Sequence, residues 1–141
     1  MRRTVLGGLS AVLGLGLLFA VPQTAAAQRK APPGGSYKQV SKLVPLPDFV
    51  PGLGALYVDP ATLPAGPFLA YDRKGTLVSS IYMIPLSQMN AQKNFADLNV
   101  AKGQPVNHVD IVYNAGHPGV AEPHYHVILW YVPAATAAAL K

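Results

Sequence analysis

The chain has 141 residues, of which 50% are hydrophobic and 12% charged, and its formal net charge at pH 7 is +5. This composition fits one small globular domain and argues against disorder over most of the chain. The 14 prolines and 13 glycines argue against a bundle of long helices. The absence of cysteine excludes disulfides, thiolate metal sites and a cysteine nucleophile.

Residues 1–27 have the pattern of a secretory signal peptide. Arg2 and Arg3 form a charged start, an apolar stretch runs from Val5 to Val21, and Ala25-Ala26-Ala27 is a typical cleavage site. A Sec signal is favoured over a twin-arginine signal because the charged region is very short. A membrane anchor is the alternative, although the apolar stretch is marginal for spanning a bilayer. We therefore expect a periplasmic or secreted protein with no stable membrane insertion after cleavage.

The first part of the mature chain, residues 28–42, is rich in proline and glycine and is predicted to be a flexible arm. Much of the excess positive charge of the mature chain lies in this arm. A run of basic residues interleaved with aromatic residues on one face, which nucleic-acid binding needs, is missing, so no nucleic-acid partner is expected. The β domain is expected over residues 43–133. The alanine-rich end, 134–141, is either a short helix or a frayed tail.

The pattern within 43–133 predicts a mainly β fold, either a small antiparallel sheet or a barrel, with one short helix at about 87–98 that Ser87 would cap. Prolines interrupt the apolar segment 43–51, which should therefore be extended and pressed against the core or a partner. The expected strands are 52–58, the hairpin pair 68–71 and 76–84 around the turn 72–75, and the two last strands 108–113 and 124–132. The loop between the last two strands, 114–123, is long and rich in glycine and proline.

The four histidines of the chain all lie between His108 and His126. Residues two apart on a strand project to the same face, so His124 and His126 should lie side by side, as should His108 and Asp110 on the neighbouring strand. The register decides whether the two pairs meet. With Val112 opposite His124 all four groups share one surface, whereas a slip of one residue sends His108 and Asp110 to the other face.

This concentration of imidazoles predicts a divalent metal site of Zn, Cu, Mn or Fe. The candidate ligands are His117, His124, His126, Asp110 and His108, and Glu122 is the candidate general base if the ion is catalytic. The alternative is a hydrogen-bonded structural histidine cluster in a non-catalytic binding or assembly module. Segments 81–84 and 127–132 are apolar on both faces, which is typical of a barrel or a homo-oligomer interface.

The stretch 109–119, with its Gly116-His117-Pro118-Gly119 loop, followed by Glu122-Pro123-His124-Tyr125-His126, resembles the TTHB210-like or DUF5602 group of small exported bacterial proteins of unassigned function. The resemblance covers about residues 53–132 and implies an exported protein with a Gly-His-Pro loop before a histidine-bearing strand. The His-x-His pair is also similar to the first cupin motif, although no glutamate follows His126 at the cupin spacing.

Overall fold

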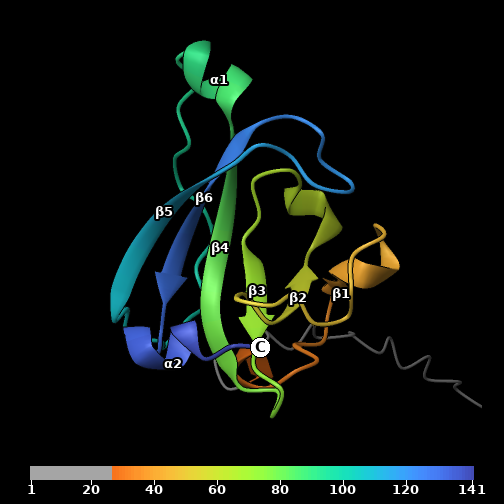
Figure 1. Ribbon diagram of the computed structural model, residues 1–141, viewed down its shortest axis with the longest axis vertical. Coiled ribbons are helices and arrows are strands. Elements are labelled where there is room, and N and C mark those ends of the chain that lie inside the picture. Colours follow the sequence, from red (N-terminus) through yellow and green to blue (C-terminus); the bar gives the residue numbers. More distant parts are fainter. Residues whose placement is uncertain (1–26) are drawn as a thin grey trace, which may run out of the picture.

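The computed structural model describes residues 27–141 and confirms a mainly β fold (Figure 1). Six antiparallel strands form one sheet: β1 Lys38–Gln39, β2 Ala55–Val58, β3 Phe68–Tyr71, β4 Leu77–Pro85, β5 His108–Asn114 and β6 His124–Trp130. Their order is β1-β2-β3-β4-β6-β5, so β1 and β5 are the two edges and the sheet is not a closed barrel. The predicted signal peptide, except Ala27, lies outside the described residues.

The hairpin of β3 and β4 confirms the clearest prediction made from the sequence. The turn between them ends at Gly75, whose φ of +71° is the left-handed conformation that glycine adopts without strain. The Asp72 carboxylate accepts hydrogen bonds from the backbone N–H groups of Lys74 and Thr76. A bulge beside Tyr71 then shifts the register of the two strands.

The helix predicted at about 87–98 is present but ends eight residues earlier than expected. The structure has a single short helix there, α1 Leu86–Asn90, and its N-cap is Pro85 rather than Ser87. Residues 91–98 form no helix, and Gln92 has a left-handed φ of +57°. Most of this stretch is exposed, so it lacks the packing that stabilises a short helix.

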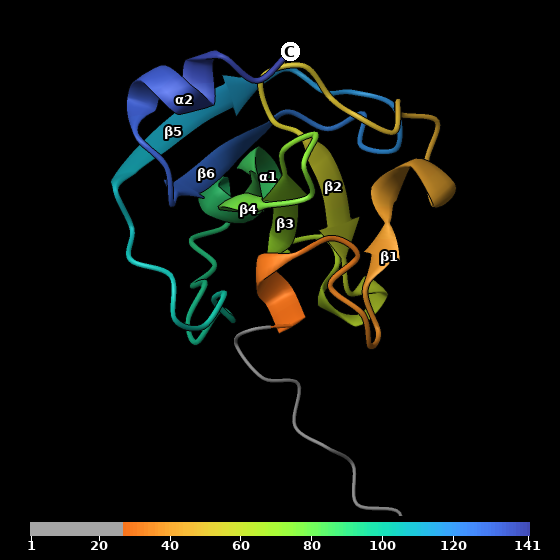
Figure 2. The same ribbon diagram turned by 90° about the horizontal axis from the view of Figure 1, so that it is seen from below.

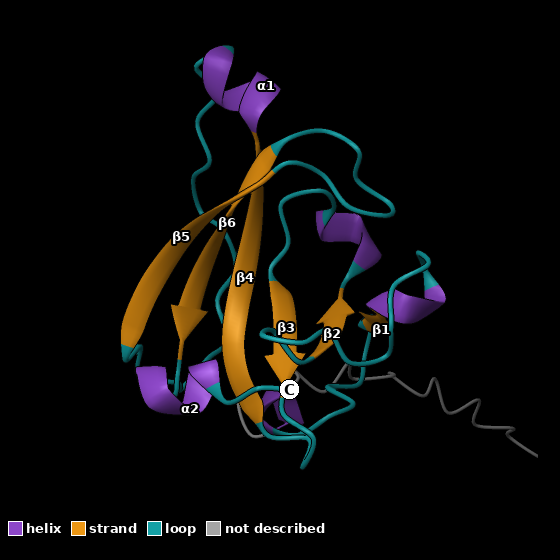
Figure 3. Cartoon of the chain, viewed as in Figure 1, coloured by secondary structure: helices purple, strands orange, loops and turns teal. Residues whose placement is uncertain are grey.

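The other helices are also short (Figure 3): the 3-10 turns η1 Ala27–Arg29, η2 Val40–Lys42 and η3 Pro60–Thr62, and α2 Ala134–Ala138. Helix α2 settles the alternative for the alanine-rich end in favour of a helix. Within residues 27–141, no helix has the length and apolar character needed to cross a bilayer.

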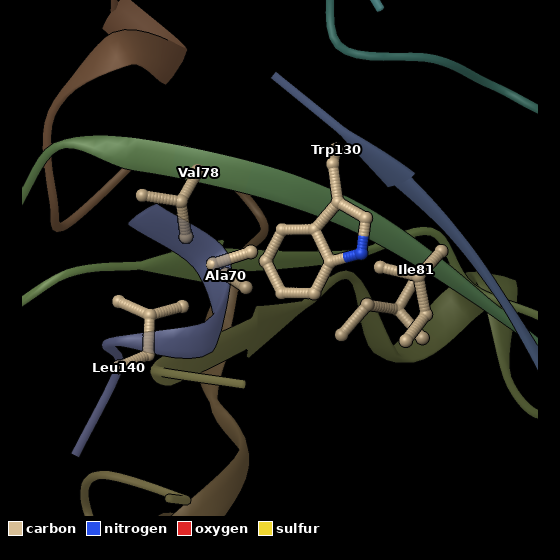
Figure 4. Packing of buried hydrophobic residues seen from close by; sticks show 7 residues of the cluster. Ala70, Val78, Ile81, Trp130 and Leu140 are labelled. Carbon is tan, nitrogen blue, oxygen red and sulfur yellow. The ribbon is translucent and has the colours of Figure 1, made fainter. Parts of the chain in front are cut away.

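The core lies on both faces of the sheet. On one face, Trp130 is 3% exposed and its indole ring points among Ala70, Val78 and Ile81 (Figure 4), with α2 and Leu140 completing the cluster. On the other face a second cluster, centred on Leu69 and Tyr71, is covered by the N-terminal segment. The two clusters together fix the central strands β3 and β4, and all nine residues of β4 are buried.

The segment expected as an arm, 28–42, contacts the sheet. Lys30 forms a β-bridge with Thr76, the Tyr71 hydroxyl donates to the backbone oxygen of Gln28, and β1 pairs with β2. Seen from below, the strands follow a curve from β5 round to β1, and the segment before β2, the loop 114–123 and α2 lie across its open side (Figure 2). The sheet is therefore a trough with a cover.

Candidate metal centre

The pairing between β5 and β6 decides which predicted site residues share a face of the sheet. His126 pairs with Val112 and His124 pairs with Asn114, two residues away from the register considered from the sequence. An offset of two keeps every side chain on its face, so His108 and Asp110 do share the surface of the two β6 histidines. The offset moves them along the strand, however, to positions opposite Trp130 and Ile128.

The loop 114–123 supplies the third imidazole through a tight turn. The backbone groups of His117 and Val120 exchange two hydrogen bonds of 2.9 Å, which closes a four-residue turn around Pro118 and Gly119. Proline at the second position and glycine with a φ of +87° at the third are what a type II turn requires. The sequence His-Pro-Gly-Val thus fixes the backbone from which the His117 ring projects.

Three histidines meet at this point: His117, His124 and His126. One ring nitrogen from each lies within 4.8 Å of the others. The ring centroids are 4.8 Å apart for His124 and His126, and 5.0 Å apart for His117 and His124. On a tetrahedral zinc ion the imidazole nitrogens lie about 3.3 Å apart, so an ion would draw the widest pair together.

Hydrogen bonds to backbone oxygens orient two of these rings. The His124 Nδ1 lies 2.7 Å from the backbone oxygen of Glu122, and the His117 Nδ1 lies 3.0 Å from that of Pro118. A carbonyl oxygen can only accept, so each Nδ1 carries the proton and each Nε2 keeps its lone pair. This is the arrangement that second partners give to metal-binding histidines.

The third ring completes the group. The Nε2 atoms of His124 and His126 are 3.0 Å apart. Because the His124 Nε2 has the lone pair, the His126 Nε2–H must donate to it when no ion is bound. An ion would take the place of this shared proton, with the His126 proton then on Nδ1.

Burial, followed by the neighbouring imidazoles of His124 and His117, lowers the pKa of His126 to about 4 from its ordinary value of 6.5. His126 is therefore neutral at physiological pH, which is the form that binds metal. In the metal-free protein, His126 therefore binds a proton near pH 6.5 when the chain is unfolded but only near pH 4 when it is folded.

We therefore expect the free energy of unfolding of the metal-free protein to fall as the pH drops from 6.5 to about 4. Denaturant unfolding in the presence of a chelator measures this slope. The variant His126→Gln should have a shallower slope, whereas His108→Gln, with a histidine outside the group, should keep that of the native chain. Equal slopes for the native chain and His126→Gln would contradict the assignment.

The other predicted site residues lie outside this group. The Asp110 carboxylate accepts a 2.8 Å hydrogen bond from the Trp130 Nε1–H, and the His108 ring stacks on the same indole. The Glu122 carboxylate accepts the backbone N–H of Ser87 at the start of α1, at 3.1 Å. Its backbone oxygen, not its carboxylate, contacts the histidines. The role of Glu122 as a general base stays a prediction.

An apolar cavity of about 350 Å³ adjoins two of the three rings, and sequence reasoning missed it. Its lining residues come from the five strands β2 to β6, from residues 40–53 and 63–64, and from the turn at 117–120. His117 and His126 line it, but His124 does not. A Cβ at Gly119 would lie 2.5 Å from the Val44 Cγ1, so the turn packs directly on the segment 43–51. That segment's proline-punctuated apolar pattern was the one signal of the cavity.

No protein-family model and no curated protein matches the chain. Among solved structures, it is similar to the crystal structure of hypothetical protein TTHB210 from Thermus thermophilus, with 46% sequence identity and a TM-score of 0.62. The match covers 67% of this chain and 92% of that one.

Proposed function

The chain belongs to the TTHB210-like family of unassigned function, and we propose that it is an exported protein that binds one divalent metal ion through His117, His124 and His126. Export rests on the sequence of residues 1–27. One observation carries the metal proposal. The Nδ1–H groups of His117 and His124 are engaged by backbone oxygens, which leaves the Nε2 lone pairs to converge.

Zinc fits this donor set best. Three imidazoles with a fourth position open are a known arrangement of zinc sites, and imidazole also suits copper and iron. Manganese prefers oxygen ligands. The group of candidate ligands found among the described residues contains no carboxylate. The hydrogen bonding of the three rings argues against a purely structural cluster. In such a cluster His126 would be a half-buried ring that hydrogen-bonds only to another imidazole.

Metal content tests the proposal. Protein recovered from the periplasm or medium, purified without a histidine tag and beginning at Gln28, should contain or take up about one equivalent of zinc per chain. Cobalt(II) should occupy the same site and give the visible spectrum of a four-coordinate ion. Protein that cannot be loaded with either ion would discard the proposal.

A second candidate function, assembly of identical subunits, is favoured by the exposed apolar edge strand β5. Val109, Ile111 and Tyr113 are 52%, 68% and 53% exposed. Within the described sheet, β5 pairs only with β6, and its register runs without a bulge. Proline, lysine and bulges, which usually protect such an edge, are missing from this strand. We propose that two copies pair their β5 strands antiparallel about a two-fold axis.

Light scattering should therefore report a dimer at micromolar concentration. Ile111 is the middle residue of β5, and Ile111→Lys should shift the mass to that of the monomer because the two new charges would face each other near the axis. The matched control is Val100→Lys, at a residue that is also exposed (55%) but lies outside the sheet. A native chain that is monomeric throughout would overturn the pairing.

A further inference from the structure

The cavity beside the histidines has a strongly uneven polarity. Its lining is almost entirely aliphatic or aromatic, for example Leu46, Leu56 and Phe68. The polar side chains among its lining residues are those of three residues only: Asn114, His117 and His126. An apolar hollow with a few polar groups gathered in one place is the usual form of a small-molecule site.

The three polar side chains lie together at one end. Asn114 pairs with His124 across β5 and β6, and the rings of His117 and His126 are 5.9 Å apart. The Oδ1 of Asn114 accepts the backbone N–H of Gly116 at 2.8 Å. Its side-chain NH₂ group is therefore the part left to donate a hydrogen bond.

The metal's open position would face this same end. His124 is 0% exposed and forms no part of the cavity wall, whereas His117 and His126 do. An ion held by the three rings is thus backed by His124 and open toward the cavity. A cation and an NH₂ donor both attract an oxygen that carries negative charge.

We propose that the cavity binds a small molecule with an apolar chain and one carboxylate, the chain filling the apolar part and the carboxylate lying between the metal ion and Asn114. The volume of about 350 Å³ is within the range of small-molecule sites. It is equivalent to about a dozen water molecules, whose release from apolar walls favours binding. The choice of head group rests on the proposed metal function, whereas binding of the chain rests on the cavity alone.

The test uses the full chain, expressed with its leader and exported, and decanoate as the probe, below its micelle concentration. Calorimetry compares decanoate with acetate, which has the head group only, and with decanol, which has the chain only. Decanoate should bind zinc-loaded protein at least ten-fold more tightly than either. Removal of zinc should erase its advantage over decanol. In cobalt-loaded protein, decanoate should also change the visible spectrum.

Two filling variants place the probe. Leu56→Trp in β2 and Leu46→Trp in the segment 43–51 should each weaken decanoate binding at least ten-fold. Both variants should still bind about one equivalent of zinc, which shows that the metal site is folded. Val100→Trp, at an exposed residue outside both the sheet and the cavity lining, is the matched control and should bind as the native chain does. Decanoate binding that survives both filling variants, or that acetate equals, would overturn the proposal.

The outcomes separate this proposal from the metal function. Zinc uptake without any binding of decanoate would sink the ligand proposal and leave the metal site standing. Equal binding of decanoate and decanol that is lost in Leu56→Trp, in a chain that takes up no zinc, would sink the metal site and the choice of carboxylate but keep an apolar ligand.

Discussion

Replacing His117, His124 or His126 by alanine should lower the affinity for zinc at least about 100-fold. Loss of a residue that only orients a ligand costs about 10- to 100-fold, so loss of a ligand itself should cost at least the upper value. Competition with a chelator of known affinity measures the change. His108→Ala is the matched control, because His108 lies on the same face but stacks on Trp130 instead of joining the group.

The three alanine variants differ in what else they disturb. His124 is fully buried, and its removal leaves a hole and an unpaired backbone oxygen at Glu122, so His124→Ala should also unfold more easily. His117 and His126 are half-buried, and their variants should keep the native fold by circular dichroism. Native zinc affinity in either of these two folded variants would contradict the three-histidine site.

Gly116→Ala should be the most damaging substitution in the loop that carries His117. The φ of Gly116 is +123°, a conformation that other residues rarely adopt, and a Cβ there would lie 2.6 Å from the backbone oxygen of Ala121. Relief of this clash must move the backbone next to His117. We expect a loss of about 2–3 kcal/mol in the free energy of unfolding and at least a ten-fold loss in zinc affinity.

Gly52→Ala is the control for backbone strain without a clash. The φ of Gly52 is +81°, but nothing lies within 4 Å of its added Cβ. This variant should lose about 1 kcal/mol and keep its zinc affinity. Denaturant unfolding and the chelator competition report the two effects separately. If Gly116→Ala lost no more stability than Gly52→Ala and kept its zinc affinity, the turn would not need the backbone conformation of Gly116.

Local patterns predicted much of the fold and part of the site. The β-prone runs on either side of the turn at 72–75 gave the hairpin, because turn residues and alternation act over a few residues. The spacing of two between His124 and His126 placed both on one face for the same reason. The Gly-His-Pro-Gly loop also carries a histidine of the group, as its place outside the packed strands suggested.

Contacts between distant segments account for what was missed. The register between β5 and β6 depends on packing along the whole pair, including the bond from Trp130 to Asp110, so the offset of two could not be read from the sequence. The predicted helix at 87–98 was too long because an apolar period in the sequence does not show whether the folded protein offers a surface for the helix to pack against. The cavity depends on residues 40–53 folding over the trough, far from the histidines in the chain.

The full burial of His124 bears on how an ion comes and goes. His124 is buried, whereas His117 and His126 border the apolar cavity, so an ion held by the three nitrogens would have the cavity on one side. A small molecule bound in the cavity would cover the ion on that side. Metal exchange should therefore be slower when the cavity is occupied. The lifetime of the bound metal ion would then report on the small molecule even if the equilibrium affinity for the metal does not change.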